Sequence, residues 1–558
     1  MFRRGFLGCF TSALALSACS IPNHVIEEQV TACDTPYDPS DILRIDAHTH
    51  VMNGRDSNGR AFVGRQSKGT AGVDLENSHL LFLVDFERRS HVLGPFAKAL
   101  KTEVETLRDI AQQDAQQDAT GTATLCRTAA ERQKVLASVS TNRGYLPGLA
   151  GFTRDRLRNA ALMLSNWPNV DMFAVSMVDF HEKQNGKDPY EPQLQLEFYD
   201  LLHQASLGRM LPLVSFQPER DTVATYDSEG RKTGERPYID LVREAIEERG
   251  FIGVKVHPSV GFDPWDNFEF GCNNSGHHND NEAERFRDVY EGRSKGSVTA
   301  EEARQKAEVW NKNMRALYRL CEELDVPILT HNSTGLSRNY KCMMPEEVTP
   351  LDWTNSSAHW GKLLDPNIGT FPNITDHTGI NAYPDETYRK PKWKNLRVCL
   401  GHFADGFKEQ LDSSGHKTGV YEPGPWLTAA AEFMRRDRRG ALWLDLSAMK
   451  DVLTEAPQLE AFQAFMNDQR NANVLTDQVL YGSDWHMPSS HLKGYLGGFE
   501  NMFSPRTKAK IMGLNAVEFY ALKAGRPTHQ RLLKYYKAHD IDLKNVRWHQ
   551  RLRQKGLA

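Results

Sequence analysis

Six residues that can bind a metal ion or transfer a proton stand at the ends of short apolar runs along this chain. They are His48, His50, Lys255, His331, His402 and Asp484. A polar residue that closes an apolar strand lies where the strand leaves the core, and a barrel enzyme gathers its active site from such positions. The repetition of this pattern predicts one shared site.

The first two histidines have a spacing that suits metal binding. His48 and His50 are two residues apart, and side chains at positions i and i+2 of a strand point to the same side. Both imidazoles can then reach one ion. A histidine pair is a weak motif by itself, but this one directly follows Ile-Asp-Ala at the end of a first apolar run. We therefore interpret the pair as metal ligands.

Later runs add the remaining donors. His331 and His402 each end an apolar run, and either one alone would be interpreted as a structural histidine. Together they supply a third and a fourth imidazole nitrogen, which suit zinc and similar divalent ions. Asp484 adds a carboxylate that can be both a ligand and a proton acceptor. The set predicts a centre of one or two divalent ions, with zinc favoured.

Eight short apolar or β-branched runs are predicted to be the strands that position these residues. They cover residues 42–47, 172–178, 211–216, 251–256, 326–330, 396–401, 441–446 and 478–482. Amphipathic helices are expected at 238–248 and 313–324, and a Ser-Pro pair predicts a helix over 504–522. Alternating strands and helices are typical of parallel β/α units. Eight units favour an α/β fold closed into a (β/α)₈ TIM barrel over an open sheet.

Three connections are too long to be simple loops. They cover residues 52–166, 261–307 and 335–392, after strands 1, 4 and 5, and the first contains a helical pattern from 95 to 115. Each follows a strand that ends in one of the six residues. Loops after the strands of a parallel barrel lie on the catalytic face, so these insertions are expected to roof the site and confine a substrate.

The ordered motifs resemble a known superfamily. Asp-Ala-His-Thr-His, Gly-Val-Lys-Val-His-Pro, Pro-Ile-Leu-Thr-His, Leu-Gly-His and Gly-Ser-Asp-Trp resemble the amidohydrolases, especially the amidohydrolase-related (amidohydrolase 2) branch of lactonases, decarboxylases and hydratases. The resemblance covers residues 42 to about 522. It implies a metal-containing (β/α)₈ barrel with ligands from strands one, five, six and eight. The implied ligands are His48, His50, His331, His402 and Asp484.

Lys255 has two interpretations under this resemblance. In some members of the superfamily, a lysine that ends strand four is carboxylated by carbon dioxide and bridges two metals. The amidohydrolase-related branch often has such a lysine while binding one metal. Because a free ammonium repels a cation, Lys255 is expected to be carboxylated, to point away, or to bind an anionic substrate group. Its state decides between a mononuclear and a binuclear centre.

Two further histidines are candidate substrate contacts. His257 lies two residues beyond Lys255 and shares its side if the strand continues, although a structural role is the alternative. The family's Gly-Ser-Asp-Trp is usually followed by proline, whereas here His486 and Met487 precede Pro488. This departure leaves the geometry after strand eight open.

The resemblance supports a hydrolase that cleaves an amide, ester or lactone bond of a small organic substrate. Asp484 would take a proton from water whose pKa a metal has lowered, and His402 would complete a second metal position or polarise the scissile carbonyl. A metal-dependent decarboxylase or other lyase on the same barrel is the alternative within enzymes. A non-catalytic, lipid-anchored binding protein is disfavoured because Asp484, dispensable for passive binding, accompanies all four histidines.

The first nineteen residues are predicted to be an export signal. An arginine pair precedes an apolar run, 6–16, that is too short to span a bilayer. Leu-Ser-Ala-Cys, ending at Cys19, resembles a bacterial lipobox, and Arg-Arg-Gly-Phe-Leu resembles the twin-arginine consensus. Residues 20–41 are expected to be a tether. Because the residue after Cys19 is not Asp, the predicted location is the periplasmic face of the outer membrane; an ordinary cleaved signal is the alternative.

Composition limits the partners. The chain is 40% hydrophobic and 25% charged, which is typical of a globular protein, and its formal charge of -4 indicates no nucleic-acid or polyanion partner. The basic residues 523–558 are interpreted as a solvated helical extension. Cys321 and Cys399 are expected to be buried thiols, and the oligomeric state is not predicted. Four other cysteines could form two disulfides outside the cytoplasm: Cys33, Cys126, Cys272 and Cys342.

Overall fold

The computed structural model describes twelve stretches of the chain. They are residues 41–52, 56, 100–118, 155–179, 192–226, 232–258, 262–265, 267, 300–333, 355–365, 393–484 and 494–558. The predicted signal, almost all of the predicted tether and large parts of the three predicted insertions lie outside these ranges. So do the following predicted residues: Cys19, Cys33, Cys126, Cys272, Cys342 and His486.

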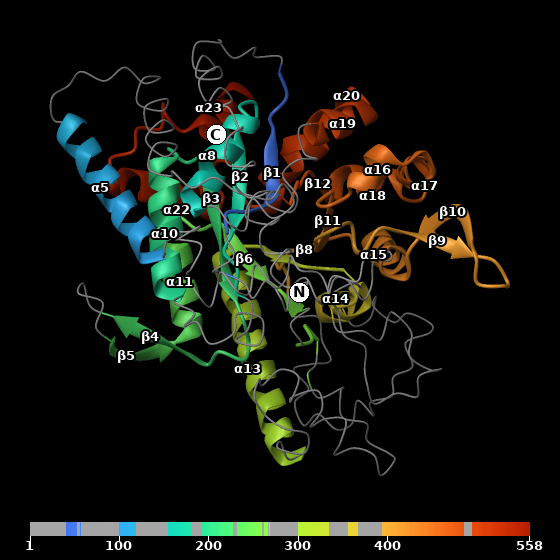
Figure 1. The fold of residues 1–558 in the computed structure, drawn as a ribbon, viewed down its shortest axis with the longest axis horizontal. Coiled ribbons are helices and arrows are strands. Elements are labelled where there is room, and N and C mark those ends of the chain that lie inside the picture. The colour runs from blue at the N-terminus through green and yellow to red at the C-terminus, as the bar shows by residue number, and fades with distance from the viewer. Residues whose placement is uncertain are drawn as a thin grey trace, which may run out of the picture.

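Eight parallel strands form one sheet in the order β1-β2-β3-β6-β7-β8-β11-β12 (Figure 1). They are β1 (Ile45–His50), β2 (Met172–Ser176), β3 (Met210–Phe216), β6 (Gly253–Val256), β7 (Ile328–Thr330), β8 (Val398–Leu400), β11 (Leu442–Asp445) and β12 (Val479–Leu480). The sheet closes where the amide of Ala47 donates to the carbonyl of Tyr481, at 2.9 Å, and the amide of Asp484 donates to the carbonyl of His48, at 2.8 Å. The predicted (β/α)₈ barrel is therefore confirmed.

All eight predicted strands are present, with differences at their ends. β1 continues through His50, three residues beyond the predicted end, so both histidines lie on the strand itself. β8 ends at Leu400, because the chain from His402 to Asp405 adopts positive φ values of 58°, 50°, 49° and 67° and turns out of the sheet. The predicted strand 396–401 is longer than β8 because residues on either side of the hydrogen-bonded part are also buried and apolar residues continue there.

Helices follow most strands and cover the outside of the barrel (Figure 1). They are α5 (Leu100–Asp118), α8 (Arg156–Asn166), α10 (Pro192–Ala205), α11 (Tyr238–Glu248), α13 (Ala300–Leu324), α14 (Ser357–Leu364), α15 (Pro425–Arg436), α16 (Lys450–Thr454), α17 (Ala456–Asn467), α18 (Ala472–Gln478), α19 (Tyr495–Met502), α20 (Pro505–Ala509), α21 (Asn515–Phe519), α22 (Pro527–Ala538) and α23 (Arg547–Gln554). The predicted helix 238–248 is confirmed at both ends.

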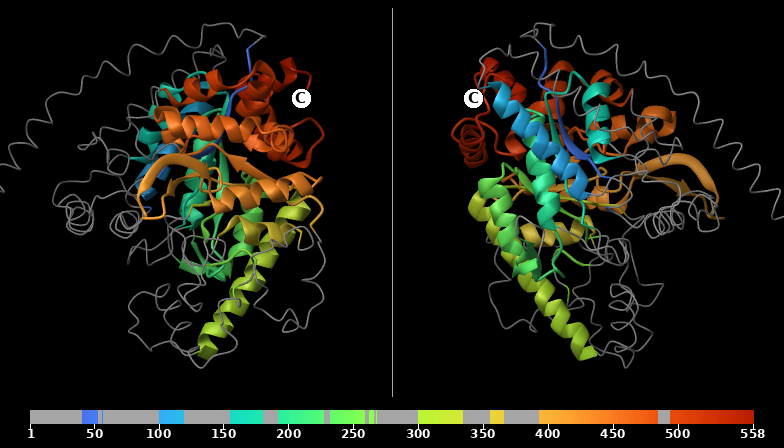
Figure 2. Two further views of the ribbon diagram at one scale, coloured as in Figure 1. Left: turned by 90° about the vertical axis from the view of Figure 1, so that its right-hand side faces the viewer. Right: turned by 60° about the vertical axis from the view of Figure 1, so that its left-hand side comes forward.

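The other two predicted helices need correction. The helix predicted at 313–324 begins at Ala300, inside the predicted insertion 261–307. The prediction started too late because the polar first half of the helix has no apolar periodicity. That half projects away from the barrel (Figure 2). Ser504 is the expected N-cap and accepts from the amide of Thr507. The helix that follows is interrupted by a π-helical turn, η8 (Lys510–Leu514), where Gly513 packs so closely on Leu43 that a Cβ would not fit.

Two hairpins were not predicted. β4 (Thr222–Tyr226) pairs with β5 (Lys232–Pro237), and β9 (Phe407–Leu411) pairs with β10 (Lys417–Pro423). Both stand away from the barrel in Figure 1. Side chains of β5 and β10 are exposed or half-buried, so these strands lack the apolar run that marks a core strand.

The C-terminal segment is helical, as predicted, but it is not a solvated extension. Leu532, Tyr536, Trp548 and Leu552 are buried in an apolar cluster that also contains residues of the first barrel strand. Arg551 donates to the carbonyls of Asp41 and Ile42, at 2.8 and 2.9 Å. The segment therefore closes the N-terminal face of the barrel, and its basic residues alternate with the buried ones at helical spacing.

Among the cysteines in the described ranges, Cys321 and Cys399 are buried and unpaired, as expected. Within the same ranges, no helix combines the length and the apolar character that a membrane span needs.

Candidate metal centre

Closure of the barrel brings three predicted residues together. His48 and His50 belong to β1, and Asp484 follows β12, which lies beside β1 in the closed barrel. One ligand atom from each residue lies within 4.8 Å of the others. Asp484 Oδ1 is 3.5 Å from His50 Nε2 and 3.9 Å from His48 Nε2. All three side chains are buried, so their ligand atoms face a shielded interior site.

His48 is oriented through both ring nitrogens. Its Nδ1 lies 2.9 Å from Asp445 Oδ2, and its Nε2 lies 2.7 Å from Lys255 Nζ. A carboxylate that accepts the Nδ1 proton leaves a lone pair on Nε2, on the side of the cluster. Burial lowers the pKa of His48 well below its usual value, and the charges of Lys255 and His402 lower it further. His48 is therefore held as a neutral imidazole, the form that binds a metal.

Asp445, the last residue of β11, was missed in the sequence. Besides His48, its carboxylate accepts the backbone amides of His402, at 3.1 Å, and Ser447, at 3.0 Å, and the Ser447 hydroxyl. It is fully buried. A signal existed, because Leu-Trp-Leu-Asp is another apolar run that ends in a polar residue. Leu446 continues the apolar character, so the sequence predicts a strand, 441–446, that contains the aspartate and does not end at it.

Replacing Asp445 with Asn should weaken metal binding about 10- to 100-fold. The Asn oxygen can accept a hydrogen bond either from His48 or from the two backbone amides. In both cases the Asn NH₂ group then faces the remaining N–H donor, with which it cannot form a hydrogen bond. His48 would lose its fixed tautomer. Competition with a chromogenic chelator measures the affinity, and Asp109→Asn, at an exposed position of α5, is the control. Equal metal affinities in both variants would remove this role from Asp445.

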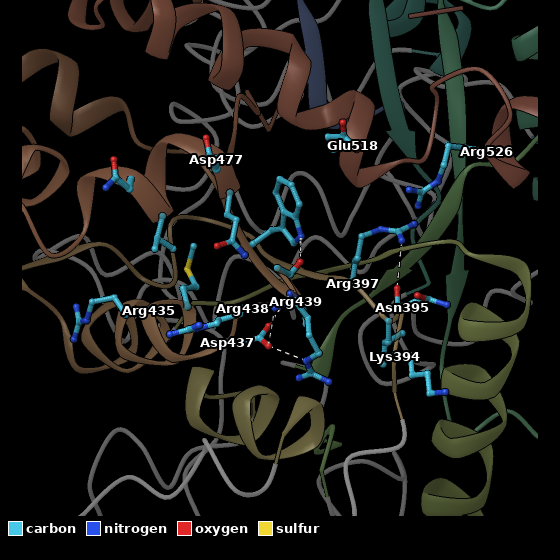
Figure 3. A pocket seen from close by; sticks show the side chains of 18 residues that line it. Lys394, Asn395, Arg397, Arg435, Asp437, Arg438, Arg439, Asp477, Glu518 and Arg526 are labelled. Carbon is cyan, nitrogen blue, oxygen red and sulfur yellow. Dashed lines mark hydrogen bonds and ion pairs between the residues drawn. The ribbon is translucent and has the colours of Figure 1, made fainter.

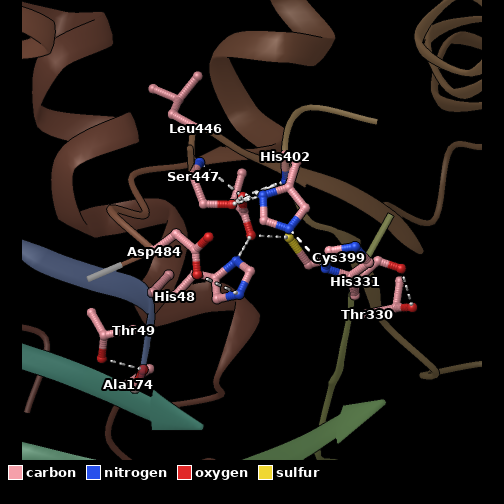
Figure 4. A network of polar contacts seen from close by, with 12 residues as sticks. His48, Thr49, Ala174, Thr330, His331, Cys399, His402, Leu446, Ser447 and Asp484 are labelled. Carbon is pink, nitrogen blue, oxygen red and sulfur yellow. Dashed lines mark hydrogen bonds and ion pairs between the residues drawn. The ribbon is translucent and has the colours of Figure 1, made fainter. Parts of the chain in front are cut away.

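His402 lies beside His48, and His331 lies beside His402 (Figure 4). His402 Nε2 is 2.9 Å from His331 Nδ1, and His402 Nδ1 is 3.2 Å from the Ser447 hydroxyl. The His48 and His402 rings are 5.4 Å apart. In the described part of the chain, the buried His331 Nε2 has no hydrogen-bond partner. Such an orphaned nitrogen points to a ligand, because buried polar atoms are otherwise paired.

Both of these histidines are also neutral near pH 7. Burial lowers the pKa of His402 to about 4, against an opposing contribution from Asp445. Burial lowers the pKa of His331 well below its usual value, and His402 and Lys255 lower it further. The site thus contains several uncharged imidazoles around one carboxylate, which is a donor set that suits a divalent cation.

Lys255 faces the cluster. Its side chain is fully buried, and its amino group donates to His48 Nε2, so the expectation that it points away is wrong. Burial lowers the pKa of Lys255 to about 8, while Asp445 and Asp484 oppose the shift. His257 shares this side of β6, as predicted: its buried ring lies 6.2 Å from the His50 ring and 5.9 Å from the His331 ring.

Asp484 can carry a proton near neutral pH. Burial raises the pKa of this carboxyl to about 7; Lys255 opposes the shift, and Asp445 adds to it. Its φ of 54° turns the chain sharply out of β12. Gly482 permits the close approach of β1, because a Cβ there would lie 2.9 Å from the Cβ of His48. Gly482, two residues before Asp484, is therefore needed to bring Asp484 and His48 together.

Asn355, which lies inside the predicted insertion 335–392, holds the segment that carries His331. Its side-chain NH₂ donates to the His331 carbonyl, and its own carbonyl accepts from the Asn332 amide group. Asn355 is fully buried with a φ of 73°, in the left-handed region that Asn tolerates better than most residues. No sequence signal identified it, because asparagines are frequent in loops.

Residues 235–522 match the family model described as amidohydrolase. No curated protein matches the chain. Among solved structures, the chain is similar to 5-carboxyvanillate decarboxylase from Novosphingobium aromaticivorans, complexed with manganese and 4-hydroxy-3-methoxy-5-nitrobenzoic acid, with 12% identity over 88% of this chain and 98% of that chain and a TM-score of 0.37. It is also similar to a probable 2-pyrone-4,6-dicarboxylic acid hydrolase from Acinetobacter baumannii, with 11% identity, 65% and 88% coverage and a TM-score of 0.32.

Proposed function

This chain belongs to the amidohydrolase family, and from that premise we propose that it is a metal-dependent hydrolase that cleaves an amide, ester or lactone bond of a small organic substrate. The observation that carries the proposal is the convergence of His48, His50 and Asp484, whose ligand atoms lie within 4.8 Å of one another. The matched region contains Asp484 but begins after the two histidines, so the closed barrel adds evidence that the family match does not.

The donor set fits a divalent ion. His48, His50 and Asp484 would hold it, with the ion replacing Lys255 as the partner of His48 Nε2, and His331 would contribute its orphaned Nε2. We propose a single ion, with zinc favoured, because the described part of the chain brings together one group of three donors, His48, His50 and Asp484. When bound, the ion would supply Lewis acidity, which lowers the pKa of water and polarises a carbonyl group.

The protein's own groups can then move the protons. Asp484, with its pKa near 7, would take a proton from the attacking water and donate it to the leaving group. His402 is neutral at this pH, and its Nε2 would accept the Nδ1 proton of His331 and so keep the orphaned Nε2 of His331 available to the ion. Lys255, when protonated, would attract an anionic group of the substrate. His257, whose ring lies beside the His50 and His331 rings, would contact the substrate.

Turnover in ¹⁸O-labelled water tests the reaction. The metal-loaded protein is screened with small esters, lactones and amides and with aromatic carboxylic acids, and the products are analysed by mass spectrometry. Incorporation of one labelled oxygen per bond cleaved is the expected result. Release of carbon dioxide without incorporation would assign the site to a decarboxylase, and a metal-loaded protein that only binds these compounds would be a non-catalytic binder.

Metal binding should weaken in acid because of Asp484. In the metal-free protein its raised pKa means that an ion must displace a proton below about pH 7. The histidines with strongly lowered pKa values are already neutral there. Between pH 7 and 5 the metal affinity should therefore fall more steeply in the wild type than in Asp484→Asn, because metal binding to the wild type releases one more proton. Calorimetry in two buffers with different ionisation enthalpies counts the protons; parallel pH profiles would contradict this assignment.

We also propose that the protein is exported and lipid-anchored at Cys19, on the evidence of the Leu-Ser-Ala-Cys motif. The first described residue, Asp41, lies on the N-terminal face of the barrel, opposite to the metal cluster, so a tether on this face would leave the cluster pointing away from the membrane. Replacing Cys19 with Ser should move the protein from the membrane fraction to the soluble fraction. Unchanged fractionation and no labelling of the wild type by radioactive palmitate would contradict the anchor.

A further inference from the structure

A substrate of the metal cluster binds at the C-terminal ends of the barrel strands. A cavity of about 650 Å³ opens at the other face, at the N-terminal ends of β8, β11 and β12 (Figure 3). Two of the residues that line it, Asp437 and Arg439, pair with each other. Because all eight strands are parallel, this cavity and the cluster lie on opposite faces. Substrate contacts must therefore come from inward-facing side chains at the C-terminal ends.

The strands β2 and β3 supply none of the predicted metal ligands, yet each carries a polar side chain towards the barrel interior. Ala174 on β2 and Leu213 on β3 lie in the apolar cluster where inward-facing residues of several strands meet. Side chains alternate between the two sides of a strand. Ser176 is two residues beyond Ala174, and Gln217 is four residues beyond Leu213, so both face the same interior.

Strand pairing places these two residues next to the histidines of the site. Ser176 is the partner of His50 in the register of β1 and β2. The register of β3 and β6, extended by one residue, makes Gln217 the neighbour of His257. The His50 and His257 rings lie 6.2 Å apart. Ser176 and Gln217 therefore belong to one wall of the site, with Ser176 at the greater depth.

Both side chains are buried, and each has a polar atom that lacks a partner. Ser176 is 0% exposed and Gln217 is 1% exposed. In the part of the chain that the structure describes, the Ser176 hydroxyl and Gln217 Oε1 form no hydrogen bond. An unpaired polar atom in the interior is unfavourable, so such atoms mark positions that a bound molecule completes.

The Gln217 amide can face in only one direction. Its Nε2 donates to the backbone carbonyl of Asp179, at 2.6 Å. A flipped amide would place Oε1 against that carbonyl oxygen, and two acceptors repel each other. Arg220 donates from Nε and Nη2 to the Asp179 carboxylate, at 2.8 and 3.0 Å, so Asp179 is itself held in place. Gln217 Oε1 is therefore a fixed acceptor that needs a donor.

We propose that Gln217 selects substrates that carry a hydroxyl group away from the scissile bond, and that this hydroxyl donates to Gln217 Oε1. The Ser176 hydroxyl would bind a polar atom of the same substrate deeper in the barrel. The inference rests on the proposed function, because it assigns a substrate class to the same site. A substrate without the hydroxyl leaves Oε1 unpaired, and an ether or carboxylate oxygen in its place is repelled.

The test uses the full, metal-loaded protein and three forms of γ-butyrolactone: hydroxylated at the α or β carbon, unsubstituted, and methoxylated at the same carbons. A methoxy group can accept a hydrogen bond but cannot donate one. For at least one hydroxylated isomer, kcat/KM should exceed the values of the other two forms about tenfold or more. Calorimetry with the corresponding γ-lactams, which resist hydrolysis better, measures the same preference as binding.

Two variants separate the two contacts. Gln217→Met replaces the amide with an apolar group of similar size and should reduce the preference for the hydroxylated form about tenfold. Ser176→Ala removes a hydroxyl that has no partner in the described protein, so it should raise KM while Tm stays equal or rises. The matched controls Gln463→Met and Ser413→Ala, at exposed positions, should change neither the preference nor KM.

The outcomes distinguish this inference from the proposed function. Lactone hydrolysis without a preference for a hydroxylated form, or with the same preference in Gln217→Met, would refute the hydroxyl contact and leave the hydrolase standing. A binding preference among the lactams without any turnover would support the contact and contradict the hydrolase. If the wild type neither binds nor hydrolyses any of these compounds, both proposals are wrong.

The remaining results bear on folding. A lower Tm with unchanged KM in Ser176→Ala would make Ser176 a structural residue and remove its contact with the substrate. If Gln217→Met does not fold, the comparison of hydroxylated with methoxylated compounds in the wild type decides alone, because only a fixed acceptor separates these two forms about tenfold.

Discussion

Replacing Asp484 with Asn should reduce kcat by about 10²- to 10⁴-fold, the usual contribution of a general acid or base. The amide has the shape of the carboxyl group but cannot accept a proton, so it cannot transfer one from water to the leaving group. Its buried position, 3.5 Å from His50 Nε2, makes replacement by solvent inefficient. Steady-state kinetics on a substrate found by the screen, together with metal analysis of the same sample, measures the effect.

A control is needed to separate chemistry from folding. Asp451→Asn, at an exposed position in the first turn of α16, should keep wild-type activity and metal content. If Asp484→Asn retains normal kcat with normal metal content, Asp484 is not the proton acceptor. A loss of activity that is fully restored by excess metal would instead make Asp484 a ligand only.

Deleting residues 523–558 should abolish folding of the barrel. Leu532, Tyr536, Trp548 and Leu552 are at most 1% exposed, and each buried side chain of this size contributes about 1.5–3 kcal/mol. Their sum approaches the 5–15 kcal/mol that stabilises a typical domain. The truncated chain is therefore expected to be insoluble. Expression followed by solubility and circular dichroism measurements checks this result.

A point substitution tests the same contact more gently. Trp548→Ala should destabilise the protein by about 3–5 kcal/mol, as measured by urea unfolding, through the loss of a large buried side chain. Arg553→Ala, at an exposed position of the same helix, α23, should change the free energy of unfolding little. A soluble, active truncated protein would show that the segment is an accessory one, as the sequence suggested.

The barrel could be predicted because its strands are buried on both faces. Such strands are continuous apolar runs, and five of the eight predicted runs ended at or beside a polar residue that marked the catalytic face. The hairpins β4–β5 and β9–β10 were not predicted, because exposed strand residues need not be apolar and so leave no apolar run in the sequence. The C-terminal segment was misinterpreted for the opposite reason: its many basic side chains hid the buried aromatic residues that lie between them.

The candidate site was predictable to a similar degree. His48, His50 and Asp484 lie together because parallel strand ends converge, which is a rule that sequence can use. Asp445 also lies at a strand end on this face, but Leu446 extends the apolar run past it, so the run does not appear to end at the aspartate. Asn355 obeys no such rule, because its role depends on where a loop folds back onto His331. Contacts of this kind come from tertiary structure and leave no local pattern.

The most direct test of a metal-dependent site at the His48, His50 and Asp484 cluster is metal analysis of protein purified without chelator. Elemental analysis by mass spectrometry should find one equivalent of a divalent metal in the wild type and much less than one in the double variant His48→Ala/His50→Ala. Activity should disappear on exhaustive chelation and return when metal is added back. A wild-type protein that contains no stoichiometric metal and remains fully active after chelation would contradict the account.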